Sequence, residues 1–256
     1  PDGSTHVPLA ATSGDCPFHA ESTAGGTFNF PPRAQPMHAA RRALIAAMDV
    51  VDDRNNVIPS PQHRDHVAVI TFDTLDGSGP QVHQPLTGNY AAAMQSVTTI
   101  QAVGDKAATT ATEAGLDLAA KHLLPQSKGG AARDDSEKVV VLLTDGVPNL
   151  YISADSDIDS FMGANPSSDF YGGGFYWLDA PLMQATMMEI AGTDMFPVGI
   201  GLGTDYDFMD RMARSGGTAN SSGASPRGSG NPTEYEQRLI DIFDKIIKKP
   251  TARLVQ

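Results

Sequence analysis

Apolar residues recur three and four positions apart near the start of the chain, at Met37, Ala40, Leu44, Met48 and Val51. This spacing is the period of an amphipathic helix. A proline opens the stretch and a polar run closes it. The pattern therefore predicts one long helix with a single apolar face.

Runs of consecutive apolar residues predict buried strands. Val67–Phe72 reads VAVITF, and Lys138–Thr144 reads KVVVLLT. Five consecutive apolar residues in the second run predict burial on both faces, as in a parallel sheet covered by helices. Met195–Ile200 predicts another short strand, in which Pro197 favours a position near an edge or a strand start. Gln81–Leu86 alternates polar and apolar residues, which is typical of an antiparallel or edge strand.

Further helical patterns lie between and after these strands. They cover Tyr90–Ile100, Thr110–Leu124, Pro181–Ala191, Asp205–Arg214 and Glu234–Lys248. The order of helices and strands predicts a doubly wound α/β sheet with right-handed crossovers. Ligands of such sheets bind at the carboxyl ends of the strands. The residues that follow each strand are therefore the first candidates for a site.

The chain divides into three kinds of sequence. Residues 1–35 are rich in Gly, Pro, Ser, Thr and Ala without a lasting period, which predicts an irregular loop or insertion. Residues 36–250 carry the periodic patterns and are expected to form one domain. Within that domain, residues 150–180 form an acidic and aromatic insertion.

Composition narrows the class of protein. With 40% hydrophobic and 19% charged residues among 256, the chain is typical of a folded globular protein. A net charge of −12 repels phosphate, which disfavours nucleic acid as a partner. No apolar run approaches the roughly 18 residues of a membrane span. The single cysteine, Cys16, excludes an internal disulfide, and the start at Pro1 suggests a chain processed or cut from something longer.

Asp145 follows the strongest strand, in the run VVVLLTDGVPN. The strand delivers this carboxylate to its carboxyl end, and Gly146 permits a sharp turn with close backbone approach. A carboxylate there is a hard oxygen ligand that suits Mg²⁺ or Ca²⁺. Strand context alone leaves a second interpretation open, in which Asp145 caps the turn or helix that follows.

A second polar cluster lies at the start of a predicted helix, in the run TTATEAGL from Thr109 to Leu116. Thr110 with Glu113 three residues later matches a capping box, and an ordinary helix cap is the simpler interpretation of this motif alone. A threonine hydroxyl at a helix start can also be a neutral metal ligand.

Together these runs resemble the von Willebrand factor type A domain, with most likeness to bacterial surface and pilus-associated members. The resemblance rests on the order and spacing of VAVITF, PLT, TATEAGL, VVVLLTDGVPN and FPVGIGLG, followed by FMDRMARSGGT. It implies a doubly wound, mostly parallel central sheet with one antiparallel edge strand and helices on both faces. It also implies a metal-ion-dependent adhesion site, in which Thr110 and Asp145 would bind Mg²⁺ or Ca²⁺.

The sequence departs from this family at the first strand and its Asp-x-Ser-x-Ser loop. Asp2 and Ser4 offer an Asp-x-Ser fragment with no strand before it, so they are the weaker metal candidates. A sheet does not easily lose a central strand, because neighbouring backbone groups would be left unpaired. We therefore expect an upstream segment or another chain to supply the missing strand. A divergent first strand within residues 1–35 is the alternative.

The insertion suggests a partner-binding surface. Asp155, Asp157 and Asp159 alternate as in a calcium loop, but Ser160 and Pro166 stand where an EF-hand needs Gly and Glu, which excludes that motif. A looser Ca²⁺ site and a solvated acidic loop remain alternatives. Tyr and Trp are frequent interface anchors. The predicted partner-binding residues are Tyr151, Asp155, Asp157, Asp159, Tyr171, Tyr176 and Trp177.

These patterns favour a non-enzymatic, metal-ion-dependent protein-binding or adhesion module, located outside the cell, on its surface or in a bacterial periplasm. An acidic side chain of the protein ligand could complete the cation's shell. The alternative is a structural or assembly subunit of a larger complex, with the same scaffold and a degenerate metal site. A hydrolase is disfavoured, because no nucleophile and base can be paired and no Gly-x-Ser-x-Gly or Walker motif is present.

Overall fold

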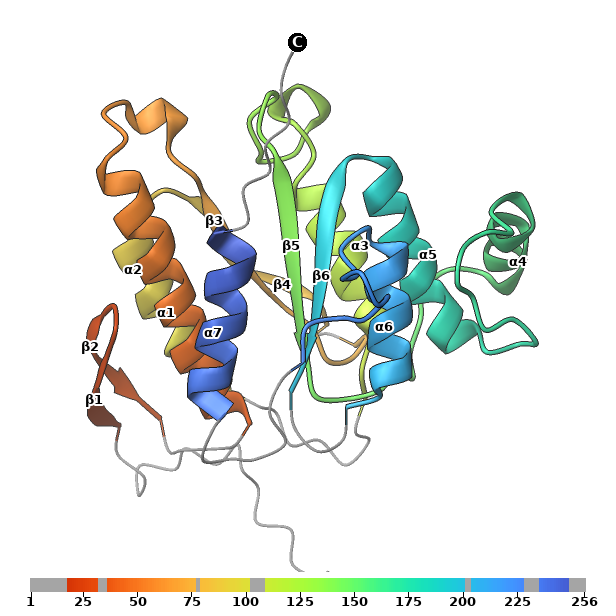
Figure 1. Ribbon diagram of the computed structural model, residues 1–256, viewed down its shortest axis with the longest axis horizontal. Coiled ribbons are helices and arrows are strands. Elements are labelled where there is room, and N and C mark those ends of the chain that lie inside the picture. Colours follow the sequence, from red (N-terminus) through yellow and green to blue (C-terminus); the bar gives the residue numbers. More distant parts are fainter. Residues whose placement is uncertain are drawn as a thin grey trace, which may run out of the picture. The chain divides into compact units, whose positions relative to one another are not determined.

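The computed structural model describes residues 18–31, 36–76, 79–101, 109–200, 204–227 and 235–248 (Figure 1). The chain divides into two compact units. Unit 1 takes residues up to 67, residues 87–104 and residues from 231 onward, and unit 2 takes residues 68–86 and 105–230. None of the described helices combines the length and apolar character that a bilayer crossing requires.

The described helices of unit 1 pack around one long helix. They are α1 (Met37–Asn56), α2 (Tyr90–Val97) and α7 (Tyr235–Lys248), with a short 3₁₀ turn η1 (Pro61–His63). Helix α1 contacts both α2 and α7 (Figure 1). It buries Ala43 and Ile45 completely. The prediction of a long amphipathic helix after Pro36 is confirmed.

Unit 1 also contains a β-hairpin that the sequence analysis missed. β1 (His19–Thr23) pairs antiparallel with β2 (Gly26–Phe30). Gly26 has a φ of 122°, a conformation that side-chain-bearing residues rarely adopt, and this permits the tight turn. The prediction of an irregular loop is therefore wrong for residues 19–30. The adjacent glycines at the turn were the available hairpin signal.

Unit 2 contains two strand pairs, and β3 and β4 each extend one residue beyond its boundary. Its elements are β3 (Val67–Thr71), β4 (Gln81–Thr87), α3 (Thr112–His122), η2 (Gln126–Lys128), β5 (Lys138–Thr144), α4 (Asp155–Ala164), α5 (Tyr176–Ile190), β6 (Thr193–Gly199) and α6 (Tyr206–Ser215). β5 and β6 run parallel, from Lys138 opposite Thr193 to Thr144 opposite Gly199 (Figure 1). This parallel pair confirms the predicted α/β class.

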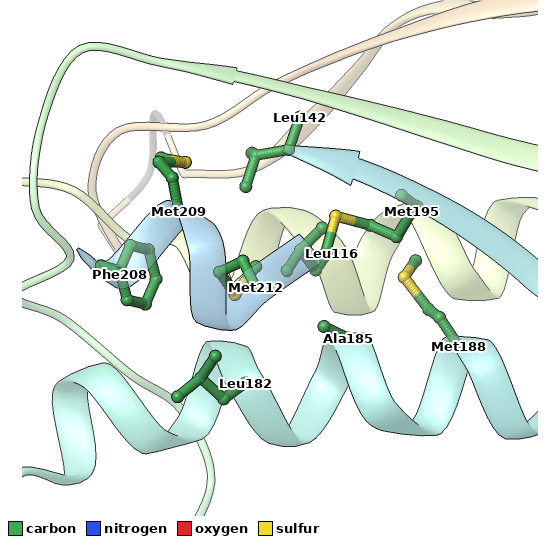
Figure 2. Packing of buried hydrophobic residues seen from close by; sticks show 10 residues of the cluster. Leu116, Leu142, Leu182, Ala185, Met188, Met195, Phe208, Met209 and Met212 are labelled. Carbon is green, nitrogen blue, oxygen red and sulfur yellow. The ribbon is translucent and has the colours of Figure 1, made fainter. Parts of the chain in front are cut away.

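One apolar cluster joins the helices and strands of unit 2. Figure 2 shows its side chains from α3, α5, α6 and both parallel strands: Leu116, Leu142, Leu182, Ala185, Met188, Met195, Phe208, Met209 and Met212. Ile70 and Phe72, at the end of β3, also pack against this cluster. Both strand pairs therefore share one core, which holds the carboxyl ends of β3 and β5 in fixed positions.

The strands β3 and β5 each have one edge that no described strand covers. Among the described residues, β3 is hydrogen-bonded only to β4, and β5 only to β6. Val139 of β5 is 46% exposed, and Val140, Val141 and Leu143 are half-buried. The burial that five apolar residues predicted for β5 is thus only partly present, and the predicted central sheet is divided into two-stranded pieces.

The insertion is more helical than the sequence analysis expected. α4 occupies residues assigned to an acidic loop, and Asp155 and Asp157 lie in its first turn, where the helix dipole favours negative charge. α5 begins at Tyr176 and contains Pro181, rather than starting there. Pro181 is past the first turn of α5, so the helix lacks the hydrogen bond that an amide at this position would donate to the Trp177 carbonyl.

Candidate functional site

The loop after β5 lies against Thr110. The Thr110 amide donates a hydrogen bond to Oδ1 of Asn149 at 2.8 Å, and its carbonyl accepts from the Asn149 amide at 3.1 Å. Gly146 faces the same residue, because a Cβ added to it would lie 3.1 Å from Thr110 Oγ1. The structure thus brings Thr110, which precedes α3, beside the loop that begins with Asp145.

The end of β3 meets the same helix start. The Ala111 amide donates to the carbonyl of Asp73 at 2.9 Å, and Oδ1 of Asp73 accepts from the Thr74 amide at 2.6 Å. The next residue, Thr112, is completely buried, and its hydroxyl has no hydrogen-bond partner among the described residues. The segments that follow β3 and β5 therefore converge on the residues that open α3.

Thr110 and Asp145 fit part of a divalent-cation site. Thr110 is half-buried and offers a neutral hydroxyl, while Asp145 is exposed and offers a carboxylate. Hard cations such as Mg²⁺ and Ca²⁺ prefer such oxygen ligands. Within the described ranges, no three His, Cys, Asp or Glu side chains gather as a metal site, so carboxylates alone do not complete a shell. Asp2 and Ser4 lie outside the described residues.

Glu113 ties the start of the insertion to α3. Its buried carboxylate accepts hydrogen bonds from the Ile152 amide at 2.5 Å, the Ser153 amide at 3.3 Å and the Ser153 hydroxyl. These donors satisfy a charge that would otherwise be costly to bury. α3 has Ala111 as its N-cap and no side-chain cap bond. The capping-box interpretation of Thr110 and Glu113 is therefore wrong.

The insertion has a small core of its own. Ile158, Ala180 and Met183 are buried together. The side chains packed on them are Tyr151, Phe161, Met162, Phe170 and Tyr176. The predicted partner-binding residues on this segment therefore extend from an ordered substructure.

A buried carboxylate closes the glycine-rich turn of the insertion. Asp179 is buried and accepts hydrogen bonds from the amides of Tyr171 and Gly172, at 2.7 and 3.0 Å. Burial raises the pKa of Asp179, and these two hydrogen bonds and Arg211 partly offset that rise. The turn before α5 is thereby fixed.

Four of the seven predicted partner-binding residues are linked to one another on this substructure by hydrogen bonds and a ring contact. Tyr151 donates its hydroxyl to Asp155 at 3.0 Å, and Tyr176 donates to Asp159 at 3.1 Å. The two tyrosine rings lie 6.4 Å apart. The carboxylate acceptors raise the pKa of both tyrosines. Asp157 is exposed on the same helix, α4.

Tyr171 and Trp177 have different surroundings. Tyr171 donates its hydroxyl to Asp207 at 2.8 Å, and the Arg211 guanidinium lies 4.0 Å from its ring centroid. Tyr171 is thus half-buried and engaged within unit 2. Trp177 is 38% exposed and meets Phe175 edge to face, with ring centroids 5.5 Å apart.

The sequence analysis gave no role to Asn149, and it placed Glu113 only in a helix cap. Both hold the segments around Thr110 through backbone groups that are 39 or 40 residues away in the chain. Asn149 stands at the end of the VVVLLTDGVPN run, which was the only signal for it. No sequence spacing pointed to the partners of Glu113.

Comparisons with known proteins agree with this architecture. The family profile described as the von Willebrand factor type A domain matches residues 40–225. No curated protein sequence matches the chain significantly.

Two kinds of solved structure illustrate the shared fold. Proximal thread matrix protein 1 from the mussel byssus aligns with a TM-score of 0.54 and 15% identity, over 82% of this chain and 43% of that chain. The pilus adhesin SpaC from Lactobacillus rhamnosus GG aligns with a TM-score of 0.56 and 17% identity, over 84% of this chain and 28% of that chain. This chain thus spans less than half the length of either protein. Identities this low indicate a common fold alone.

Proposed function

The chain belongs to the von Willebrand factor type A family, and from that premise we propose that it is a metal-ion-dependent protein-binding or adhesion module, not an enzyme. The observation that carries the proposal is the position of Thr110 against the loop that begins with Asp145. A structure of the related mussel protein is described as having a zinc-occupied MIDAS motif, at a TM-score of 0.53 and 16% identity. That likeness supports a cation at the corresponding edge of this chain.

The two donors suit a site that recruits an anionic ligand. A bound Mg²⁺ or Ca²⁺ would supply a positive centre for an oxygen atom of the partner, such as a carboxylate. Asp145 contributes one negative charge, whereas Thr110 contributes none. Because Gly146 has no side chain, the Thr110 hydroxyl can lie close to this loop.

We extend the proposal to the uncovered edges of β3 and β5. An apolar strand, from an upstream segment or another chain, would pair with these edges and cover the half-buried valines of β5. Its carboxyl end would lie near Thr110 and Asp145 and could bring the further oxygen ligands that the described carboxylates lack. The exposure of Val139 supports this extension.

The experiment is thermal denaturation of the chain, with any adjoining native sequence present, in Mg²⁺ and in chelator. Mg²⁺ should raise the melting temperature of the wild type, because a ligand that binds the folded state stabilises it. Asp145→Ala should abolish that rise, while Asp135→Ala, an exposed control, should retain it. An equal rise in both variants, or none in the wild type, would contradict a cation site at Asp145.

A structural or assembly subunit with a degenerate metal site is the second candidate. The incomplete donor set among the described residues favours it. It predicts that partner binding persists unchanged in chelator, whereas the first candidate predicts that binding is lost. For either candidate we propose an extracellular, cell-surface or periplasmic location, which the pilus and byssus origin of the two related structures favours.

A further inference from the structure

An exposed pair of aromatic rings, Phe175 and Trp177, stands where the glycine-rich turn of the insertion meets α5. We call it the aromatic corner. Phe175 is 47% exposed and Trp177 is 38% exposed, although large aromatic side chains are usually buried. Gly172, Gly173 and Gly174 precede the pair with φ values of 67°, 65° and 88°. Residues with side chains adopt such values with difficulty, so the turn that presents the rings depends on glycine.

The segment that carries the aromatic corner has charged side chains of one sign. Residues 150–180 contain five aspartates and no lysine, arginine or histidine. Two of the five are engaged internally, since Asp169 pairs with Arg211 and Arg214, and Asp179 is buried. Asp155, Asp157 and Asp159 remain exposed on α4.

A hydrogen bond links these carboxylates to the aromatic corner. Tyr176, which lies between Phe175 and Trp177 in the chain, donates its hydroxyl to Asp159. The same tyrosine packs on the core formed by Ile158 and its neighbours. Tyr176 therefore ties the segment that carries the two rings to the acidic helix before any partner arrives, which lowers the entropy lost on binding.

In unit 2, two arginines are already bound by an aromatic ring together with a carboxylate. The Arg211 guanidinium lies 4.0 Å from the Tyr171 ring centroid and bonds the carboxylates of Asp169 and Asp207. Likewise, Arg227 lies 4.4 Å from the Tyr206 ring centroid and pairs with Asp210 at 2.7 Å. A ring face next to a carboxylate binds a guanidinium by cation–π attraction and charge-assisted hydrogen bonds together.

We propose that the aromatic corner and the carboxylates of α4 bind a basic segment of a partner protein. An arginine of that segment would lie on the Trp177 ring, and neighbouring basic groups would pair with Asp155, Asp157 and Asp159. This inference rests on the proposed protein-binding function and gives the partner's chemistry at a second contact region. It requires no cation at Asp145.

Trp177 is the only tryptophan in the chain, so its fluorescence reports directly on the aromatic corner. The probe is a short oligoarginine peptide, titrated into the chain in the presence of chelator. A saturable change in emission is expected, and an oligoglutamate peptide of the same length should produce none. No response to oligoarginine, or an equal response to both peptides, would overturn the proposal.

Variants separate a local surface from a general effect of negative charge. Replacing Asp155, Asp157 and Asp159 with Asn together should weaken oligoarginine binding by about tenfold. The matched control, Asp134→Asn with Asp135→Asn and Glu137→Gln, removes three exposed negative charges elsewhere in unit 2 and should change affinity less than about twofold. Equal losses in both triple variants would contradict a local site. Circular dichroism of each variant verifies that it is folded.

Two further variants complete the test. Phe175→Leu should weaken oligoarginine binding, because it removes the ring that braces Trp177. Asp135→Ala, at an exposed carboxylate outside both proposed sites, should leave this binding unchanged. If oligoarginine fails to bind while Mg²⁺ still stabilises the wild type, only the basic-partner inference fails. If oligoarginine binds and Mg²⁺ has no effect, the proposed cation site fails instead.

Discussion

Thr110 and Asn149 hold each other through two hydrogen bonds, although they are 39 residues apart in the chain. The Thr110 amide donates to the Asn149 side chain at 2.8 Å, and the Asn149 amide donates to the Thr110 carbonyl at 3.1 Å. The pair therefore fixes the residue before α3 against the loop after β5. The proposed cation site depends on these two hydrogen bonds, because they keep Thr110 close to the loop that begins with Asp145.

Asn149→Ala should lower the free energy of unfolding by about 1 kcal/mol, because the Thr110 amide loses its side-chain acceptor. It should also reduce the stabilisation by Mg²⁺, since Thr110 would no longer be fixed beside Asp145. Thermal denaturation with and without Mg²⁺ measures both effects. Asn149→Asp retains an acceptor oxygen and should behave more like the wild type. Wild-type behaviour of Asn149→Ala would show that the pair has no such role.

Glu113→Gln should destabilise the chain by about 2 kcal/mol. The amide oxygen of glutamine can replace Oε2 as acceptor for the Ile152 and Ser153 amides, but it carries no charge. The NH2 group then replaces Oε1, which accepts from the Ser153 hydroxyl in the wild type. Chemical denaturation measures the loss. Glu137→Gln, at an exposed carboxylate, is the control and should change stability by less than about 0.5 kcal/mol. A similar small change at Glu113 would mean that its buried bonds contribute little.

Two glycines in helices should respond to alanine in opposite directions. A Cβ on Gly115 would lie 2.8 Å from Cγ of Phe72, so Gly115→Ala should lower stability by about 1–3 kcal/mol through overpacking. Gly163 has nothing within 4 Å of the same position, and it lies inside α4. Gly163→Ala should raise stability by about 0.5–1 kcal/mol through helix propensity. Melting temperatures that move in the same direction would contradict this contrast.

Asp207 should contribute stability that depends on pH. A hydrogen bond from Tyr171, and then one from Arg211, lower the pKa of Asp207 below its ordinary value of 3.8. The folded state therefore binds the proton less tightly than the unfolded chain. The contribution is fully present above pH 3.8 and is lost as the pH falls through the lowered folded-state pKa.

Melting temperatures of the wild type and Asp207→Asn, compared from neutral to acidic pH, measure this dependence. The wild type should be the more stable protein at neutral pH, and the difference should shrink below pH 3.8. Tyr171→Phe should show part of the same loss, because it removes one of the two hydrogen bonds. A difference that stays constant with pH would contradict the assignment.

Arg41 of α1 is a buried cation with few partners, and its removal should stabilise the chain. It is 1% exposed, its Nε donates to the Ile100 carbonyl, and its Nη1 has no hydrogen-bond partner in the part of the chain that the structure describes. Burial lowers the pKa of Arg41 from 12.5 to about 10. The folded state thus binds this proton less tightly than the unfolded chain, and the resulting penalty persists until the pH rises through about 10.

Arg41→Met should therefore raise the melting temperature at neutral pH, by an amount that corresponds to about 1 kcal/mol or more. The neighbouring Arg42 is the matched control, because its guanidinium pairs with Glu21 at 2.8 Å. Arg42→Met should give no such gain. A loss of stability in Arg41→Met would show that the guanidinium contributes more through packing than its charge costs.

The sequence predicted the elements whose pattern is long and regular. The five consecutive apolar residues of Val139–Leu143 predicted β5. The apolar residues spaced three and four apart from Met37 to Val51 predicted α1 and its apolar face. In contrast, α4 was hidden because Asp155, Asp157 and Asp159 suggested a solvated loop. Its inward residues, Ile158, Phe161 and Met162, have helical spacing but are too few to outweigh that signal.

The candidate site was predictable to the extent that strand ends determine it. Asp145 was a candidate from the end of its strand, whereas Thr110 was selected by the resemblance to the von Willebrand factor type A domain. The structure brings their segments together. Glu113 could not be inferred in the same way, because its donors are backbone amides of Ile152 and Ser153 on a distant segment. Sequence patterns indicate which side chains share a face of a helix or strand. Contacts such as those of Glu113 depend instead on the tertiary path that brings a distant loop back against the helix.

The small core around Ile158, Ala180 and Met183 has a consequence for how this protein could diversify. The insertion has this small core of its own, and side-chain contacts tie it to the rest of unit 2, through Glu113 at its beginning and Asp169 with Arg211 further on. During evolution this segment, and with it the binding partner, could therefore change while the pairing register of β5 and β6 stays the same. Recognition could then change quickly on a scaffold that changes slowly.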